Sequence, residues 1–179
     1  MNWLTFSILA YFGFALQLLL APNWPMQGHE PMVLLILLVF IGLQAPPMAV
    51  AWSAVVLGVL SDILVQQYEI GLIGPWAIGF LAAGYAMVQL RNLLFRDSMF
   101  TIGIMTLIAG IFALLVATML QAFRGVPMLG NDPIEGFKAA NQLYSGFFTL
   151  VNTAVFAIPV GYLLLRSRAI WTFSGRGSR

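Results

Sequence analysis

Asp62 is the residue whose chemistry most needs an explanation, because it is an acid near the end of the apolar run of residues 48–65. A carboxylate at the centre of a helix in a bilayer costs roughly 2.5 to 3.5 kcal/mol, and less towards a helix end, so it should face protein or water. Such a carboxyl group can carry protons. Alternatively, it can hydrogen-bond to a neighbouring helix or to a partner protein. We favour the second role, because no other acid or buried base accompanies Asp62 in the pattern.

The rest of the sequence offers few groups for catalysis or metal binding. It has no cysteine, and the single histidine, His29, lacks a companion for a histidine-based metal site. The motifs GxSxG, HExxH, CxxC and GxxxxGK[ST] do not occur. The charged residues Asp132, Glu135 and Lys138 fit a solvated loop better than a surface contact. We therefore predict that the protein is not an enzyme and has no catalytic residue, metal or cofactor.

The composition is that of an integral membrane protein. Hydrophobic residues make up 61% of the chain and charged residues 8%, with a mean hydropathy of +0.94, whereas about 25% of the residues of a soluble domain are charged. The net charge of +2 is spread over several connections and does not indicate nucleic acid as a partner. At about 20 residues a span, 179 residues hold five or six transmembrane helices in one membrane domain.

The apolar runs and the residues that end them predict an all-α bundle of six transmembrane helices. The predicted spans are residues 3–20, 32–45, 48–65, 71–90, 99–121 and 143–165. The second is short, because its 14 residues cover only roughly 21 Å of a hydrocarbon core about 30 Å thick. A short crossing and a re-entrant helix both fit this length. We prefer the crossing.

The distribution of basic residues predicts that both termini are cytoplasmic. With six crossings, the inner connections hold six basic residues against Arg124 and Lys138 outside, as the positive-inside rule requires. These six are Arg91, Arg96, Arg166, Arg168, Arg176 and Arg179. We expect the first four to anchor the bundle at the cytoplasmic interface.

Small residues predict where helices come close to each other. Ala54, Gly58 and Asp62 recur at intervals of four and share one face of the third predicted span. A similar face in the fifth span contains Gly103, Thr106 and Gly110, and such faces allow close helix packing in lipid. The sequence does not say which faces are internal and which serve a partner. Our candidates for packing or partner contact are Ala54, Gly58, Asp62, Gly71, Tyr85, Gly103, Gly110 and Asn152.

Several of these residues lie in a pattern that resembles the middle of the MreD family of bacterial rod shape-determining proteins. That family has a similar G-x-x-x-D at the end of one span, a Gly-Leu after a short turn, and a Gly-Tyr before a basic connection. The matching residues here are the run GVLSDIL at residues 58–64, then Gly71-Leu72, Gly84-Tyr85 and Leu90-Arg91. The short second span and the long connection of residues 122–142 depart from the family pattern.

The resemblance implies a non-enzymatic scaffold of the cell-wall elongation complex in the bacterial inner membrane. Such a protein maintains rod shape and supports peptidoglycan synthesis. The partners it implies are an MreC-like bitopic membrane protein, membrane lipids and, indirectly, MreB-like filaments and cell-wall synthases. The family bundle is also similar to the substrate-binding subunits of energy-coupling-factor transporters. The alternative function is therefore a small-molecule-binding transporter subunit, which needs convergent polar groups that the sequence does not show.

Overall fold

The described part of the chain is all-helical. The computed structural model describes residues 3–20, 30–65, 74–91, 99–124 and 138–166, and these residues contain no strand. A helix lies in each of the six predicted spans, although α5 ends three residues later than expected and α6 begins four residues earlier. The helices are α1 (Trp3–Leu20), α2 (Val33–Gln44), α3 (Pro47–Val65), α4 (Pro75–Leu90), α5 (Met99–Arg124) and α6 (Ala139–Arg166).

Prolines determine several of the helix ends. The last helical hydrogen bond of α2 runs from the Ala45 N–H to the Ile41 carbonyl, at 2.8 Å, and Pro46 follows with no N–H to continue the ladder. Pro47 and Pro75 each occupy the first position of the next helix, α3 and α4. That position suits proline, because an N–H group there has no partner within the helix, so the N–H that proline lacks leaves no helical hydrogen bond unmade.

Three of the described helices are long and apolar enough to cross a membrane. They correspond to the stretches Pro47–Leu64 in α3, Phe100–Phe123 in α5 and Ala139–Arg166 in α6. The helices α1, α2 and α4 are shorter apolar helices. The six crossings therefore stay a prediction.

Helix α2 is the centre of the bundle. It packs against each of the five other helices, and residues 33–43 are all buried. The sequence of α2 is apolar on every side, which suits a helix surrounded by protein as well as one surrounded by lipid. At 1.5 Å per residue, its 12 residues extend about 18 Å. Because protein surrounds α2, this length does not have to match the thickness of the surrounding hydrocarbon.

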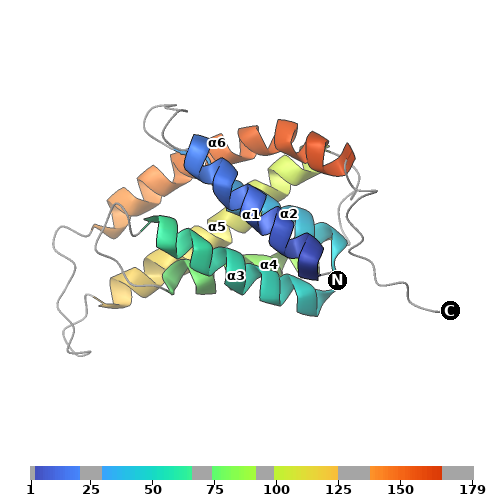
Figure 1. Ribbon diagram of the computed structural model, residues 1–179. Coiled ribbons are helices and arrows are strands. Elements are labelled where there is room, and N and C mark those ends of the chain that lie inside the picture. The colour runs from blue at the N-terminus through green and yellow to red at the C-terminus, as the bar shows by residue number, and fades with distance from the viewer. Residues whose placement is uncertain (1–2, 21–29, 66–73, 92–98, 125–137, 167–179) are drawn as a thin grey trace.

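The other helices surround α2 in an up-and-down arrangement (Figure 1). Helices α3 to α6 pack in sequence order, each against the next, whereas α1 contacts α2 and touches α3 only lightly. In Figure 1, α1 crosses in front of the bundle between α3 and α6, and the start of α1 and the end of α6 lie at the same end of the bundle.

Candidate functional site

The carboxylate of Asp62 binds the first backbone N–H groups of α4. Its Oδ2 atom accepts hydrogen bonds from the N–H of Gly74 (2.9 Å) and of Ala77 (3.1 Å), and its Oδ1 atom accepts one from Trp76 (3.1 Å). Pro75 has no N–H, and the Ile78 N–H already bonds to the carbonyl of Gly74. Asp62 therefore satisfies every N–H group from residue 74 to residue 77.

This contact is an N-terminal helix cap supplied by another helix. The first N–H groups of a helix have no partner within the helix, and its N-terminus carries partial positive charge, so a carboxylate there is stabilised. Asp62 is only 2% exposed, and water is not needed to satisfy it. The backbone of Gly74 adopts a φ of 137°, which side chains of L-residues rarely allow. That conformation directs the Gly74 N–H towards the carboxylate.

The small residues that precede Asp62 bring α3 against α4. A Cβ atom at Gly58 would lie 2.5 Å from the Cα of Ala77 and 2.9 Å from the carbonyl oxygen of Trp76. One turn earlier, the Cβ of Ala54 lies 3.2 Å from where a Cβ at Gly84 would stand. The predicted face of Ala54, Gly58 and Asp62 is thus an internal contact between α3 and α4.

Both ends of the central helix α2 are also bound by side chains of other helices. At its start, the Met32 N–H donates to Thr153 Oγ1 of α6 (2.9 Å) and the Leu34 N–H donates to Gln17 Oε1 of α1 (3.2 Å). Just beyond its end, Arg91 Nη1 donates to the Ala45 carbonyl (2.7 Å). We call Gln17, Asp62, Arg91 and Thr153 the polar caps.

The polar caps provide hydrogen-bond partners for backbone groups at the ends of short buried helices. In a bilayer core each unsatisfied backbone group costs several kcal/mol, and the ends of α2 lie among buried residues, Met32 at 7% exposed and Ala45 at 1%. Each cap hydrogen-bonds to backbone of a helix that is not its own. The sequence does not indicate this role of Thr153, because one threonine in the middle of an apolar helix carries no signal.

The second predicted small-residue face also lies inside the bundle. A Cβ at Gly103 would stand 3.2 Å from the carbonyl oxygen of Ala154 in α6, and one at Gly110 would meet the side chain of Leu150. Thr106, between them, is fully buried and donates to the Ile102 carbonyl at 2.7 Å. This face therefore packs α5 against α6.

The remaining predicted residues are not brought together. Tyr85 is exposed on α4, Asn152 is half-buried on α6, and Arg166 is exposed in the last turn of α6. Gly71, Arg96 and Arg168 lie outside the described residues, as do His29, Asp132 and Glu135.

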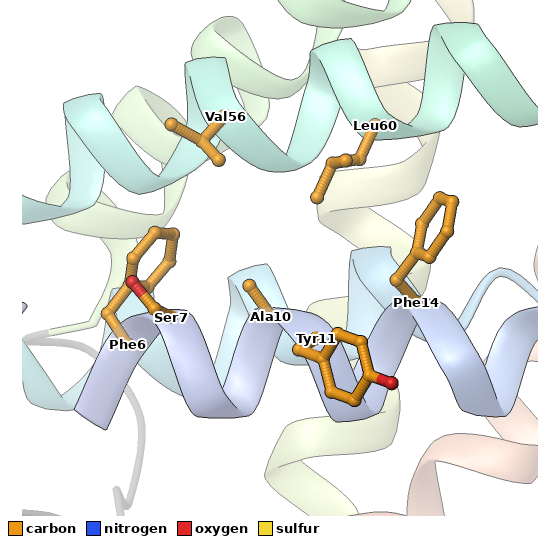
Figure 2. Close-up of a pocket in the computed structure, with 7 residues that line it drawn as sticks. All are labelled: Phe6, Ser7, Ala10, Tyr11, Phe14, Val56 and Leu60. Atoms are coloured by element: carbon orange, nitrogen blue, oxygen red, sulfur yellow. The ribbon is translucent and has the colours of Figure 1, made fainter. Parts of the chain in front are cut away.

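A groove separates α1 from α3. It has a volume of about 270 Å³ and is lined by Phe6, Ser7, Ala10, Tyr11 and Phe14 of α1 and by Val56 and Leu60 of α3 (Figure 2). We call it the α1–α3 groove. None of the polar caps lines the groove, and among its lining side chains only Ser7 and Tyr11 carry a polar group, so it lacks the several convergent polar groups expected of a small-molecule-binding subunit.

Comparison with known proteins identifies the family. The family described as rod shape-determining protein MreD matches residues 1–131, which include the G-x-x-x-D run, α1 to α4 and all of α5. Searches of curated proteins and of solved structures returned no match. The likeness to energy-coupling-factor subunits therefore stays a prediction. Because the match spans well over half of the 179 residues, the chain belongs to the MreD family of rod shape-determining membrane proteins.

Proposed function

We propose that this protein is a non-enzymatic scaffold of the bacterial cell-wall elongation complex. In this role it binds the transmembrane helix of an MreC-like bitopic partner and so supports peptidoglycan synthesis. Membership of the MreD family gives the role in rod shape determination. The observation that favours a scaffold is the kind of group to which the polar caps bond. Gln17, Asp62, Arg91 and Thr153 all hydrogen-bond to backbone at helix ends, as a structural bundle requires.

The scaffold would cross the bacterial inner membrane six times, with both termini in the cytoplasm. The excess of basic residues in the inner connections supports this orientation. The up-and-down arrangement supports an even number of crossings, because the two described ends of the chain lie at one end of the bundle (Figure 1). Helix α2 would cross the membrane surrounded by the other helices, where its length does not have to match the thickness of the hydrocarbon.

The partner helix would bind an exposed face, since both small-residue faces are used within the bundle. The outer face of α4 is our candidate. Ile78, Leu81, Tyr85 and Gln89 follow one another at intervals of three and four residues and are all exposed. Tyr85 is 68% exposed. In lipid, a hydroxyl or amide group on such a face can hydrogen-bond to another helix, and helix packing supplies the association that hydrophobicity cannot.

Co-purification of the partner tests this surface. Full-length protein that carries Leu81→Ala and Tyr85→Ala should co-purify with roughly three- to eighteenfold less of the MreC-like partner from membranes, because a polar interhelical contact in lipid contributes about 0.6 to 1.7 kcal/mol. The matched control is Tyr162→Ala, which removes another exposed tyrosine, from α6, and should leave recovery unchanged.

Two results would contradict the proposal. Full recovery from the double variant would place the contact on another face. Recovery of transporter ATPases in place of an MreC-like protein would contradict the scaffold role itself and favour a small-molecule-binding subunit.

A further inference from the structure

Arg91 lies where the ends of two helices meet the start of a third. It follows Leu90, the last residue of α4, and its Nη1 atom donates to the Ala45 carbonyl at 2.7 Å, between the end of α2 and the start of α3. The membrane-spanning stretch of α3 begins two residues after Ala45, at Pro47. Arg91 is therefore held where the apolar part of α3 begins, at the level of the lipid headgroups on that side of the membrane.

The guanidinium group of Arg91 has hydrogen-bonding capacity that the described structure does not use. A guanidinium carries five N–H donors, and the bond to Ala45 uses one of them. The Nε atom is buried and has no partner, and no described residue accepts a bond from the remaining N–H groups of Nη1 and Nη2. The side chain is thus partly buried but only partly satisfied.

The charge of Arg91 also has no counter-ion among the described residues. The acids among these residues are Glu30 and Asp62. Glu30 precedes the start of α2 and Asp62 binds the start of α4, whereas Arg91 lies at the other end of both helices. About 18 Å of α2 and about 24 Å of α4 therefore separate Arg91 from these carboxylates. A partly buried cation in a membrane protein is expected to pair with an anion, and the described residues do not supply one.

A phosphate group fits the donors that Arg91 has left. The planar fork of a guanidinium matches the oxygen atoms of a phosphate and can donate two parallel hydrogen bonds to them. Phospholipids carry phosphate at the membrane boundary, where Arg91 is held. Anionic phospholipids also bring a net negative charge, which attracts basic residues near the membrane surface.

From these observations we propose that Arg91 binds the phosphate of an anionic phospholipid. The phosphate accepts one hydrogen bond from Nη1 and one from Nη2, while the second N–H of Nη1 stays on the Ala45 carbonyl. One guanidinium thereby joins the connection between α2 and α3, the end of α4 and a lipid headgroup. The bound lipid supplies the counter-charge of Arg91 and so strengthens the contact between the ends of α2 and α4.

Lipid binding to the full-length protein in a neutral detergent tests the proposal. Phosphatidylglycerol and phosphatidylcholine with identical acyl chains are titrated separately and counted by native mass spectrometry, so that hydrocarbon contacts are equal for the two lipids. We expect the tightest site to bind phosphatidylglycerol about fivefold more tightly than phosphatidylcholine, the ratio that corresponds to about 1 kcal/mol per basic residue near an anionic surface. Inorganic phosphate should not displace this lipid, because free phosphate has no acyl chains to hold it at the bundle.

Variants of basic residues assign the preference to Arg91. Arg91→Gln removes the guanidinium and should lower the affinity for phosphatidylglycerol to that for phosphatidylcholine. Arg91→Lys keeps the charge but not the planar fork, and should retain part of the preference. Arg166→Gln removes an exposed basic residue from the last turn of α6 and should leave the preference unchanged.

Labelling of the wild type is a second measurement, which does not depend on the folding of a variant. A phosphatidylglycerol with a diazirine on its headgroup should label Met48, an exposed residue three positions after Ala45, more than Tyr162, an exposed residue one turn before Arg166. The expected ratio is again about fivefold. Adducts are mapped by mass spectrometry.

Three outcomes would overturn the inference. Equal binding of the two lipids by the wild type, or equal labelling of Met48 and Tyr162, would mean that Arg91 does not select an anionic headgroup. An unchanged preference in Arg91→Gln would mean that another group, such as the carboxylate of Asp97, neutralises Arg91. Displacement of the lipid by inorganic phosphate would identify a soluble anion as the ligand.

Discussion

At the scale of single residues, the most consequential contact is that of Asp62 with the start of α4. One carboxylate accepts hydrogen bonds from three backbone N–H groups that have no other partner in the described structure. Hydrogen bonds to a charged group contribute about 1.5 to 3 kcal/mol each in other proteins, and a buried donor left without a partner costs about 1 to 3 kcal/mol. Capping of α4 therefore explains why an acidic residue occurs in the apolar helix α3.

Substitutions of Asp62 should separate capping from ionisation. Asp62→Asn keeps one oxygen and should lower the free energy of unfolding by about 1 to 2 kcal/mol, whereas Asp62→Leu leaves all three N–H groups unpaired and should lower it by about 3 kcal/mol or more. Thermal unfolding in detergent measures both. Ile63→Leu, at the exposed neighbouring position, is the control and should have little effect.

The same variants should rank in the same order in cells. Asp62→Asn should restore rod shape to a deletion strain better than Asp62→Leu. Suppose that Asp62→Asn accumulates normally but restores rod shape no better than Asp62→Leu. Then Asp62 must ionise for the protein to function, and helix capping alone does not explain its role.

At the scale of helices, Gly58 determines how closely α3 and α4 approach. Gly58→Ala would place a methyl group against the backbone of Ala77 and Trp76, which cannot move as a flexible side chain can. We expect a loss of stability of about 1 to 3 kcal/mol, typical of overpacking. For the same reason Gly103→Leu and Gly110→Leu, which face α6, should lower the unfolding temperature.

Gly13→Ala is the matched control for Gly58→Ala. A Cβ at Gly13 would meet only the ends of flexible side chains, those of Leu37 at 3.2 Å and Leu34 at 3.6 Å, and alanine is favoured over glycine in a helix by up to about 1 kcal/mol. Its stability should be unchanged or slightly higher, as measured by the same unfolding assay. Equal losses from both variants would mean that the close approach at Gly58 is not what limits packing.

What the sequence could predict about these helices depended on local signals. Apolar runs and prolines located the helices, and the spacing of Gly58 and Asp62 indicated a packed face with a polar end. The central position of α2 could not be predicted, because a helix that is apolar on every side shows no preferred face. The pairing of Gln17 and Thr153 with the start of α2 was also hidden, since single polar residues in apolar helices do not indicate which backbone group they meet.

At the scale of the whole molecule, the helices differ greatly in length. Helices α5 and α6 have 26 and 28 residues and extend about 39 and 42 Å, longer than a hydrocarbon core of about 30 Å. The helices α1 to α4 have 12 to 19 residues. Lys138, next to the start of α6, should therefore lie outside the hydrocarbon, where a reagent in water can reach it.

Cysteine labelling should establish the topology, because the chain has no cysteine of its own. With six crossings, single cysteines in Trp3→Cys and Met48→Cys should react from the cytoplasmic side and Lys138→Cys from the opposite side. All three positions are exposed. Reaction of Trp3→Cys and Met48→Cys from opposite sides would mean that α2 does not cross the membrane.

The hydrogen bond between Met32 and Thr153 joins residues 121 positions apart, and this separation has a consequence for biosynthesis. The ribosome makes α2 long before α6, so the nascent α2 enters the membrane before Thr153 is available to accept the hydrogen bond from the Met32 N–H. Until the other helices pack around α2, its apolar surface can contact lipid, because lipid tails are as apolar as leucine side chains. The centre of this protein is thus among the first parts to be inserted and the last to be completed.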